Sequence, residues 1–99
     1  MDHFSHNSIG TFMCELYASQ PQASYDISKR SIRLQGAVTS IALENKMWEL
    51  LEHIANQEQL SVAEFISTLY QEVIDRQGAI KNLASMLRVT CLTYALNSN

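Results

Sequence analysis

Cysteine, proline and glycine are all scarce in this chain of 99 residues, which contains two, one and three of them, respectively. Cys14 and Cys91 lie far apart in the sequence and form no CxxC pair. We therefore expect two reduced, buried thiols rather than a disulfide. The few glycines form no glycine-rich phosphate loop, so this type of nucleotide site is not predicted.

Long apolar runs are also absent, although 46% of the residues are hydrophobic and only 17% are charged. This composition is typical of one ordinary globular domain, because it is too apolar for a disordered chain. The first six residues lack the basic start and apolar centre of a signal peptide. A cytoplasmic location is the expectation that follows.

A catalytic constellation is missing as well. The sequence shows neither a nucleophile beside a base nor a paired-carboxylate cleft, so we predict that the protein is not an enzyme and needs no cofactor. His3 and His6 have a helical spacing that could ligate a metal, but structural sites usually need four ligands, and we predict no metal site. His53 lies among acids in a helical pattern and is expected at the surface.

Charge is present but unevenly distributed. The net charge of −3 disfavours nucleic acid as a partner, because phosphates attract basic surfaces. Residues 27–43, however, contain Lys29, Arg30 and Arg33 and no acid, whereas residues 44–75 contain seven acids and Lys46 alone among the bases. A basic stretch is thus averaged with an acidic helical surface.

The most informative stretch, residues 38–43, alternates apolar and small polar residues and is predicted to form a strand. Its alternation places one set of residues on the core side, namely Thr39, Ile41 and Leu43. The other set, Val38, Ser40 and Ala42, then faces outward. A second strand-like run at 31–35, followed by Gly36, makes a hairpin one possible pairing, and pairing with a second copy of the chain is the other.

Three helical patterns follow the strand. The first covers residues 45–58 and the second covers 60–74, where Ser61 and Glu64 have the spacing of a capping box. Asn82 is the expected N-cap of a third helix that reaches about residue 96. This last helix is apolar around most of its circumference, which favours self-association.

A strand followed by two helices in this order resembles the ribbon-helix-helix family of DNA-binding proteins, in particular a bacterial subfamily of small ribbon-helix-helix domain proteins. The similarity covers most of residues 13–95. The sequence motifs on which the similarity rests are Met13-Cys14, Leu16-Tyr17, Arg30-Ser-Ile-Arg-Leu34, Gly36, Thr39-Ser40, Leu43-Glu-Asn-Lys-Met47, Trp48, Leu60-Ser-Val-Ala-Glu-Phe-Ile66, Asn82-Leu-Ala-Ser85 and Leu87-Arg-Val89.

The resemblance implies a mostly α fold: a homodimer with an intermolecular two-stranded antiparallel ribbon and an added C-terminal helix. Residues 1–30 would be an N-terminal extension, and residues 31–97 the ribbon-helix-helix domain with its C-terminal helix. Double-stranded DNA is the implied partner, because such a ribbon is narrow enough to enter the major groove.

Site residues follow from the same resemblance. Base contacts are expected from Val38, Ser40 and Ala42, and phosphate contacts from Lys29, Arg30, Arg33, Lys46, Ser61 and Val62. The dimer core is expected to contain Thr39, Ile41, Leu43, Trp48, Phe65 and Leu69.

The predicted function is a repressor-like transcriptional regulator that binds DNA sequence-specifically as a homodimer. The alternative is a ribbon-helix-helix scaffold that has lost DNA binding and acts as a protein-interaction or antitoxin-like module. The net acidity and the chemically quiet set Val38, Ser40 and Ala42 favour this alternative.

Overall fold

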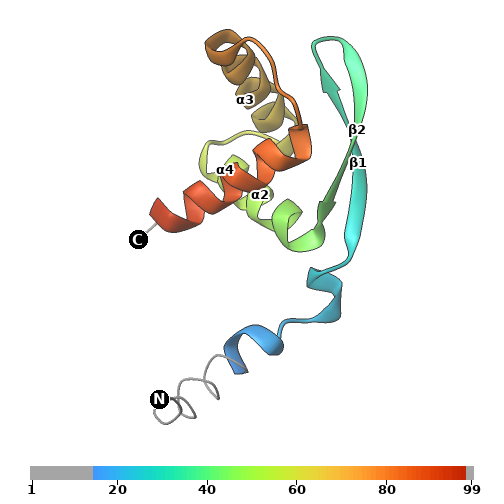
Figure 1. The fold of residues 1–99 in the computed structure, drawn as a ribbon, viewed down its shortest axis with the longest axis vertical. Helices are drawn as coiled ribbons and strands as arrows, with labels where there is room; N and C mark the ends of the chain where they lie inside the picture. The colour runs from blue at the N-terminus through green and yellow to red at the C-terminus, as the bar shows by residue number, and fades with distance from the viewer. Residues whose placement is uncertain (1–14, 98–99) are drawn as a thin grey trace.

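The computed structural model describes residues 15–97, and it consists of a β-hairpin followed by three helices (Figure 1). The hairpin strands are β1 (Ile27–Leu34) and β2 (Ala37–Glu44), which pair antiparallel. The helices are α2 (Asn45–Gln57), α3 (Val62–Gln77) and α4 (Leu83–Asn97). A helical turn at 15–18 and a 3-10 turn, η1 (Gln22–Ser24), precede the hairpin. The expected N-terminal segment is described only from residue 15, so His3, His6 and Cys14 lie outside the described residues.

A two-stranded antiparallel ribbon followed by helices is confirmed, but the strand that pairs with β2 here is β1 of the same chain and not a second copy of β2. Gln35 and Gly36 form the two-residue turn, with φ of 50° and 84°. Positive φ at both positions is the signature of a type I′ turn, whose twist matches that of the strands it joins. The hairpin that the sequence allowed therefore forms within one chain, and a ribbon between two copies would have to use an outer edge of this hairpin.

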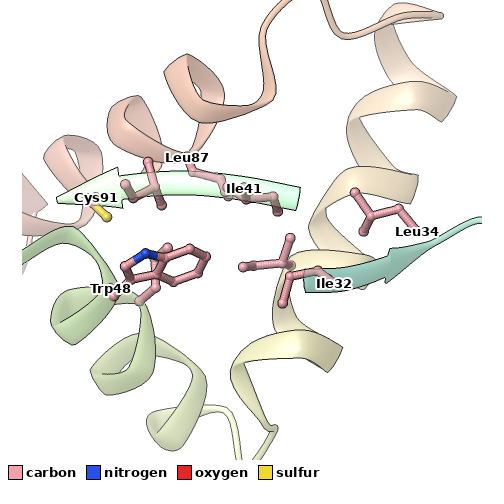
Figure 2. Packing of buried hydrophobic residues seen from close by; sticks show 9 residues of the cluster. Ile32, Leu34, Ile41, Trp48, Leu87 and Cys91 are labelled. Carbon is pink, nitrogen blue, oxygen red and sulfur yellow. The ribbon is translucent and has the colours of Figure 1, made fainter. Parts of the chain in front are cut away.

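Alternation along both strands sends one set of side chains into the core. Ile32 and Leu34 of β1 and Ile41 and Leu43 of β2 are at most 5% exposed. Figure 2 shows Ile32 and Ile41 of the hairpin and Leu87 and Cys91 of α4 gathered around Trp48. Trp48 is 1% exposed, and its indole N–H donates to the Ser28 carbonyl at 2.9 Å. Ile66 of α3 is fully buried in the same cluster, so the core forms where the inner face of the hairpin meets α2, α3 and α4.

Side-chain caps mark the starts of α3 and α4. Ser61 and Glu64 form the predicted capping box, because the Ser61 hydroxyl accepts from the Glu64 N–H and the Glu64 carboxylate accepts from the Ser61 N–H. Asn82 Oδ1 accepts from the Ser85 N–H at 2.9 Å, as an N-cap does. Gly78 ends α3 in the left-handed region, with φ of 86°. No helix within residues 15–97 is long and apolar enough to cross a membrane.

Candidate nucleic-acid interface

The outward face of the hairpin is built from both strands. The register places Lys29 opposite Ala42, Ser31 opposite Ser40, and Arg33 opposite Val38. Residues directly opposite each other share a face of the sheet, so these six side chains form one surface, which we call the outward face. All are exposed except Ala42, which is half-buried. The outward face presents two cations and two hydroxyls between apolar side chains.

The contribution of β1 to this face exceeds what the sequence indicated. Ser31 was not among the predicted contacts, yet it lies directly opposite Ser40 and is exposed. The signal that could have found it was the alternation of residues 31–35 before Gly36, since a two-residue turn fixes the hairpin register. With that register, Lys29 and Arg33 also belong to the ribbon itself.

Arg30 lies on the other face of the hairpin, opposite the buried Ile41. Its Nη1 donates to Glu52 Oε2 at 2.7 Å, and its guanidinium carbon lies 4.6 Å from the centre of the Trp48 ring. Stacking on an aromatic face and pairing with a carboxylate both favour a fixed guanidinium. Of the three bases on β1, Arg30 is thus the one held against α2, and its predicted phosphate contact stays a prediction.

Arg33 lies close to the start of α3. Its Nη1 donates to the Gly36 carbonyl at 3.1 Å, which folds the side chain toward the hairpin turn. A surface hollow of about 510 Å³ separates the turn from α3. Its lining residues are Arg33, Gln35, Gly36, Leu60, Ala63, Glu64, Ser67 and Thr68. The structure therefore brings one predicted phosphate contact, Arg33, beside the helix start that contains two others, Ser61 and Val62.

The capping box already uses polar groups of this helix start. The Ser61 hydroxyl accepts from the Glu64 N–H, and the hydrogen bonds from the Ser61 backbone and side chain hold the pKa of Glu64 below its ordinary value. Glu64 thus stays negatively charged at neutral pH. The helix start can offer backbone N–H groups to a phosphate, but a carboxylate lies beside them.

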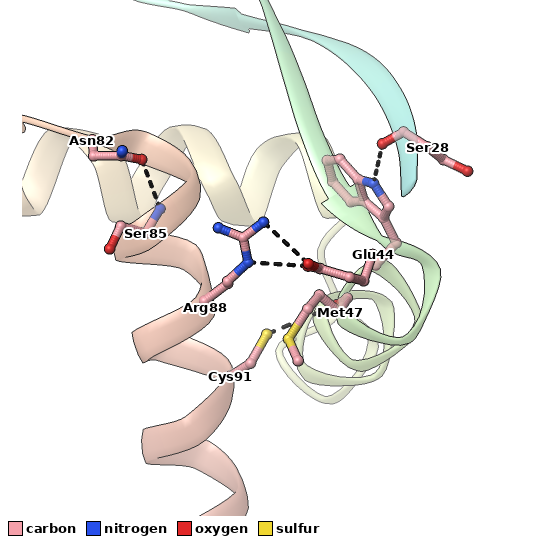
Figure 3. A network of polar contacts seen from close by, with 8 residues as sticks. Ser28, Glu44, Met47, Asn82, Ser85, Arg88 and Cys91 are labelled. Carbon is pink, nitrogen blue, oxygen red and sulfur yellow. Dashed lines mark hydrogen bonds and ion pairs between the residues drawn. The ribbon is translucent and has the colours of Figure 1, made fainter. Parts of the chain in front are cut away.

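The base of the hairpin contains an acid, Glu44, that α4 neutralises. Arg88 donates to it through Nε at 3.0 Å and Nη2 at 3.3 Å (Figure 3). The hydrogen bond from Arg88 is the main reason that the pKa of Glu44 lies below its usual value. Lys46, the next base along the chain, pairs with Glu49 at 3.2 Å and is exposed at the start of α2. It lies at the base of the hairpin, whereas Arg33 lies near the turn.

One edge of β2 has no partner strand within the described residues, because the sheet there has two strands only. The Asn45 N–H donates to the Asp26 carbonyl at 2.8 Å, so this pair belongs to the hydrogen-bonded set. Hydrogen-bonded and non-bonded pairs alternate along an antiparallel ladder, which makes 31/40 and 33/38 non-bonded pairs. The backbone N–H and C=O groups of Val38, Ser40 and Ala42 consequently point toward the free edge of β2.

No cluster of three metal-ligating His, Cys, Asp or Glu side chains occurs among residues 15–97. Cys91 is a free buried thiol, and burial raises its pKa, so it is protonated at neutral pH. These groups offer no additional chemistry at the outward face.

The comparisons with known proteins agree with this architecture. A family model described as a ribbon-helix-helix domain matches residues 27–95, and the chain belongs to this family. The family is in general one of DNA-binding regulators. The chain is similar to the solved structure of an uncharacterized protein from Bordetella pertussis Tohama I, with 40% identity and a TM-score of 0.82. The match covers 85% of this chain and 67% of that one. No curated protein matches the chain.

Proposed function

We propose that the protein is a homodimeric, sequence-specific DNA-binding regulator of repressor type whose hairpin face lies on the major groove. The observation that carries the proposal is the outward face, where Lys29 and Arg33 are exposed beside two serines. Glu44, the acid at the end of β2, is paired with Arg88. An uncompensated positive surface of this kind attracts phosphates even though the whole chain is acidic.

The dimer forms, in this proposal, through the free edge of β2. Antiparallel pairing with the same edge of a second copy gives both copies partners for the N–H and C=O groups of Val38, Ser40 and Ala42. The result is a four-stranded sheet with β2 and its copy at the centre. The predicted dimer-core residues support this dimer unevenly. Ile41, Leu43 and Trp48 are already buried within one chain, whereas Thr39, Phe65 and Leu69 are only half-buried.

The width of such a sheet assigns a role to each strand. Neighbouring strands lie about 4.8 Å apart, so the two β1 strands would be separated by roughly 14 Å. The major groove is about 12 Å wide and admits a two-stranded ribbon. The central β2 strands would therefore enter the groove, and Lys29 and Arg33 on β1 would reach the phosphates on either side. Ser40 would be the hydrogen-bonding reader of base edges, with apolar contact from Val38 and Ala42.

A gel-shift assay on genomic fragments at low salt tests this function. Wild-type protein is expected to retard DNA, and the double variant Lys29→Ala/Arg33→Ala is expected to lose most of this binding. Lys81→Ala is the matched control, because Lys81 is an exposed base in the connection before α4. Absence of binding by the wild type would favour the second candidate, a scaffold that binds a protein. That candidate is supported by the acidic exposed surfaces of α2 and α3, which contain Glu49, Glu52, Glu64, Glu72 and Asp75.

A further inference from the structure

The last helix, α4, has an exposed apolar surface that no other element covers in the described part of the chain. Val89, Leu92 and Leu96 are 57%, 58% and 70% exposed. Leu87 and Cys91, on the opposite side of the helix, are at most 1% exposed and pack into the core. Successive residues of an α-helix are about 100° apart, so the exposed set forms one stripe that points away from the hairpin.

The spacing of this stripe is that of a helix that packs along another helix. Ser85, Val89, Leu92 and Leu96 follow each other at intervals of four, three and four residues. This is the interval of the a and d positions in a heptad, where side chains of one helix fit between those of its neighbour. A stripe with this spacing is typical of a helix-to-helix contact rather than of an isolated exposed leucine.

A groove lies directly beside the stripe. It has a volume of about 530 Å³ and is lined by residues of α2, α3 and α4, namely Ile54, Val73, Ser85, Met86, Val89, Thr90, Thr93 and Tyr94. Ser85 and Val89 belong to both the groove and the stripe. The protruding stripe and the groove that could receive it therefore lie on one continuous surface. A two-fold interface requires such self-complementarity, because both copies use the same patch.

Charge separates α4 from the other helices. Its fifteen residues contain one charged side chain, Arg88, and this is paired with Glu44. The exposed side of α2 contains two acids, Glu49 and Glu52, and that of α3 contains three, Glu64, Glu72 and Asp75. A second copy of α4 can approach the stripe without burying a charge or opposing like charges, whereas α2 or α3 of another copy would bring carboxylates into an apolar contact.

We infer that the α4 stripe and its groove bind the same surface of a second copy of this chain. Because the stripe points away from the hairpin, this contact is separate from the β2 edge. The inference rests on the proposed function only for the final number of copies. If the β2 edge also forms a dimer, the α4 contact joins two such dimers into a tetramer. Standard interfaces use roughly 20–30 residues a side. The stripe and groove together offer fewer, so the α4 contact is the weaker one and dissociates first on dilution.

Sedimentation equilibrium of the full chain at micromolar concentrations tests this inference. The variant Val89→Gln/Leu92→Gln keeps the charge and helix propensity of α4, and both side chains are more than half exposed, so the fold should persist and circular dichroism should be unchanged. Its mass is expected to be half that of the wild type. Ile27→Gln is the control, because Ile27 is equally exposed (60%) but lies at the start of β1, outside both α4 and the free edge of β2, and the mass of this variant should equal that of the wild type.

The outcomes separate the two proposals. A tetramer that becomes a dimer supports both contacts, and a wild-type dimer that becomes a monomer supports the α4 contact while the β2 contact fails. An unchanged mass in the double variant overturns the α4 inference whether or not the protein binds DNA. A monomeric wild type also overturns it, and would leave residues 1–14 of the same chain or another protein as the occupant of the groove.

Discussion

Ser31 and Ser40 lie directly opposite each other at the middle of the hairpin, and both residues are exposed. Two residues along each strand, the next outward pairs are Lys29 with Ala42 and Arg33 with Val38. The centre of the outward face is therefore polar and neutral, and its two ends are basic on β1. This arrangement gives the hairpin distinct reading and anchoring positions, and it allows the following predictions.

Ile41 and Val38 test the assignment of the two faces. Ile41 is 3% exposed and Val38 is 62% exposed. Ile41→Lys places an unpaired charge in the core and is expected to lower the free energy of unfolding by at least about 3 kcal/mol. Val38→Lys is expected to change it by less than about 0.5 kcal/mol. Thermal unfolding followed by circular dichroism measures both. A stable Ile41→Lys beside a destabilised Val38→Lys would show that the faces are inverted.

Arg30 is expected to contribute to stability more than to DNA binding. Arg30→Gln removes the stacking on Trp48 and the ion pair with Glu52, both partly exposed, which together are expected to stabilise the fold by about 1 kcal/mol. Trp48 is the only tryptophan, so its fluorescence in a urea titration reports the unfolding.

Arg33→Gln is the matched comparison for Arg30→Gln, because it removes the same charge from the outward face. It should leave the urea midpoint nearly unchanged and weaken DNA binding more strongly than Arg30→Gln. If Arg30→Gln kept its stability but lost DNA binding, this prediction would be wrong, and Arg30 would be a DNA contact rather than a stabilising residue.

The ion pair between Glu44 and Arg88 predicts a pH dependence of stability. The folded-state pKa of Glu44 lies below its ordinary value of 4.5, so the stabilisation by the pair is fully present above about pH 4.5. It is lost as the pH falls through the folded-state pKa. Glu44→Gln should therefore be less stable than the wild type at pH 7, and the difference should shrink in more acidic solution.

Arg88→Gln is the control for this titration, since it removes the main cause of the lowered Glu44 pKa and should show a similar loss of acid dependence. Wild type and variants are compared by urea unfolding across the acidic range. A stability difference between wild type and Glu44→Gln that stays constant down to about pH 3 would contradict the role of the pair.

The hairpin turn can be improved if its geometry is correct. Gln35 has a φ of 50°, which asparagine tolerates better than glutamine, and Asn-Gly is the preferred pair of a type I′ turn. Gln35→Asn is expected to stabilise the fold by about 0.5 kcal/mol. It removes an exposed hydrogen bond to Gln71 that contributes little. Gly36→Ala forces an alanine to a φ of 84° and should lower the melting temperature. A Gly36→Ala variant more stable than Gln35→Asn would exclude this turn type.

Much of this fold followed from local patterns in the sequence. The alternation of Thr39, Ile41 and Leu43 identified the inner face of β2, and Ser61, Glu64 and Asn82 marked two helix starts, because these features act between neighbours in the chain. The partner of β2 could not be derived in this way. Both edges of a strand are chemically alike, so alternation does not show which edge is paired, or by what.

Arg30 illustrates a second limit. Its charge suggested a place beside Lys29 and Arg33, but the extension of β1 back to Ile27 sets the alternation and turns Arg30 toward Trp48 and Glu52. These partners lie 18 and 22 residues away along the chain. Contacts over such separations depend on how α2 packs on the hairpin, which no local pattern specifies.

The salt dependence of DNA binding is the most direct test of the outward face. Each phosphate contact contributes roughly 0.9 to the slope of log affinity against log salt concentration. We predict a steep negative slope for the wild type, the same slope for Lys81→Ala, and a clearly shallower slope for Lys29→Ala/Arg33→Ala. Equal slopes for the wild type and the double variant would contradict the claim that the hairpin face is the surface that binds DNA.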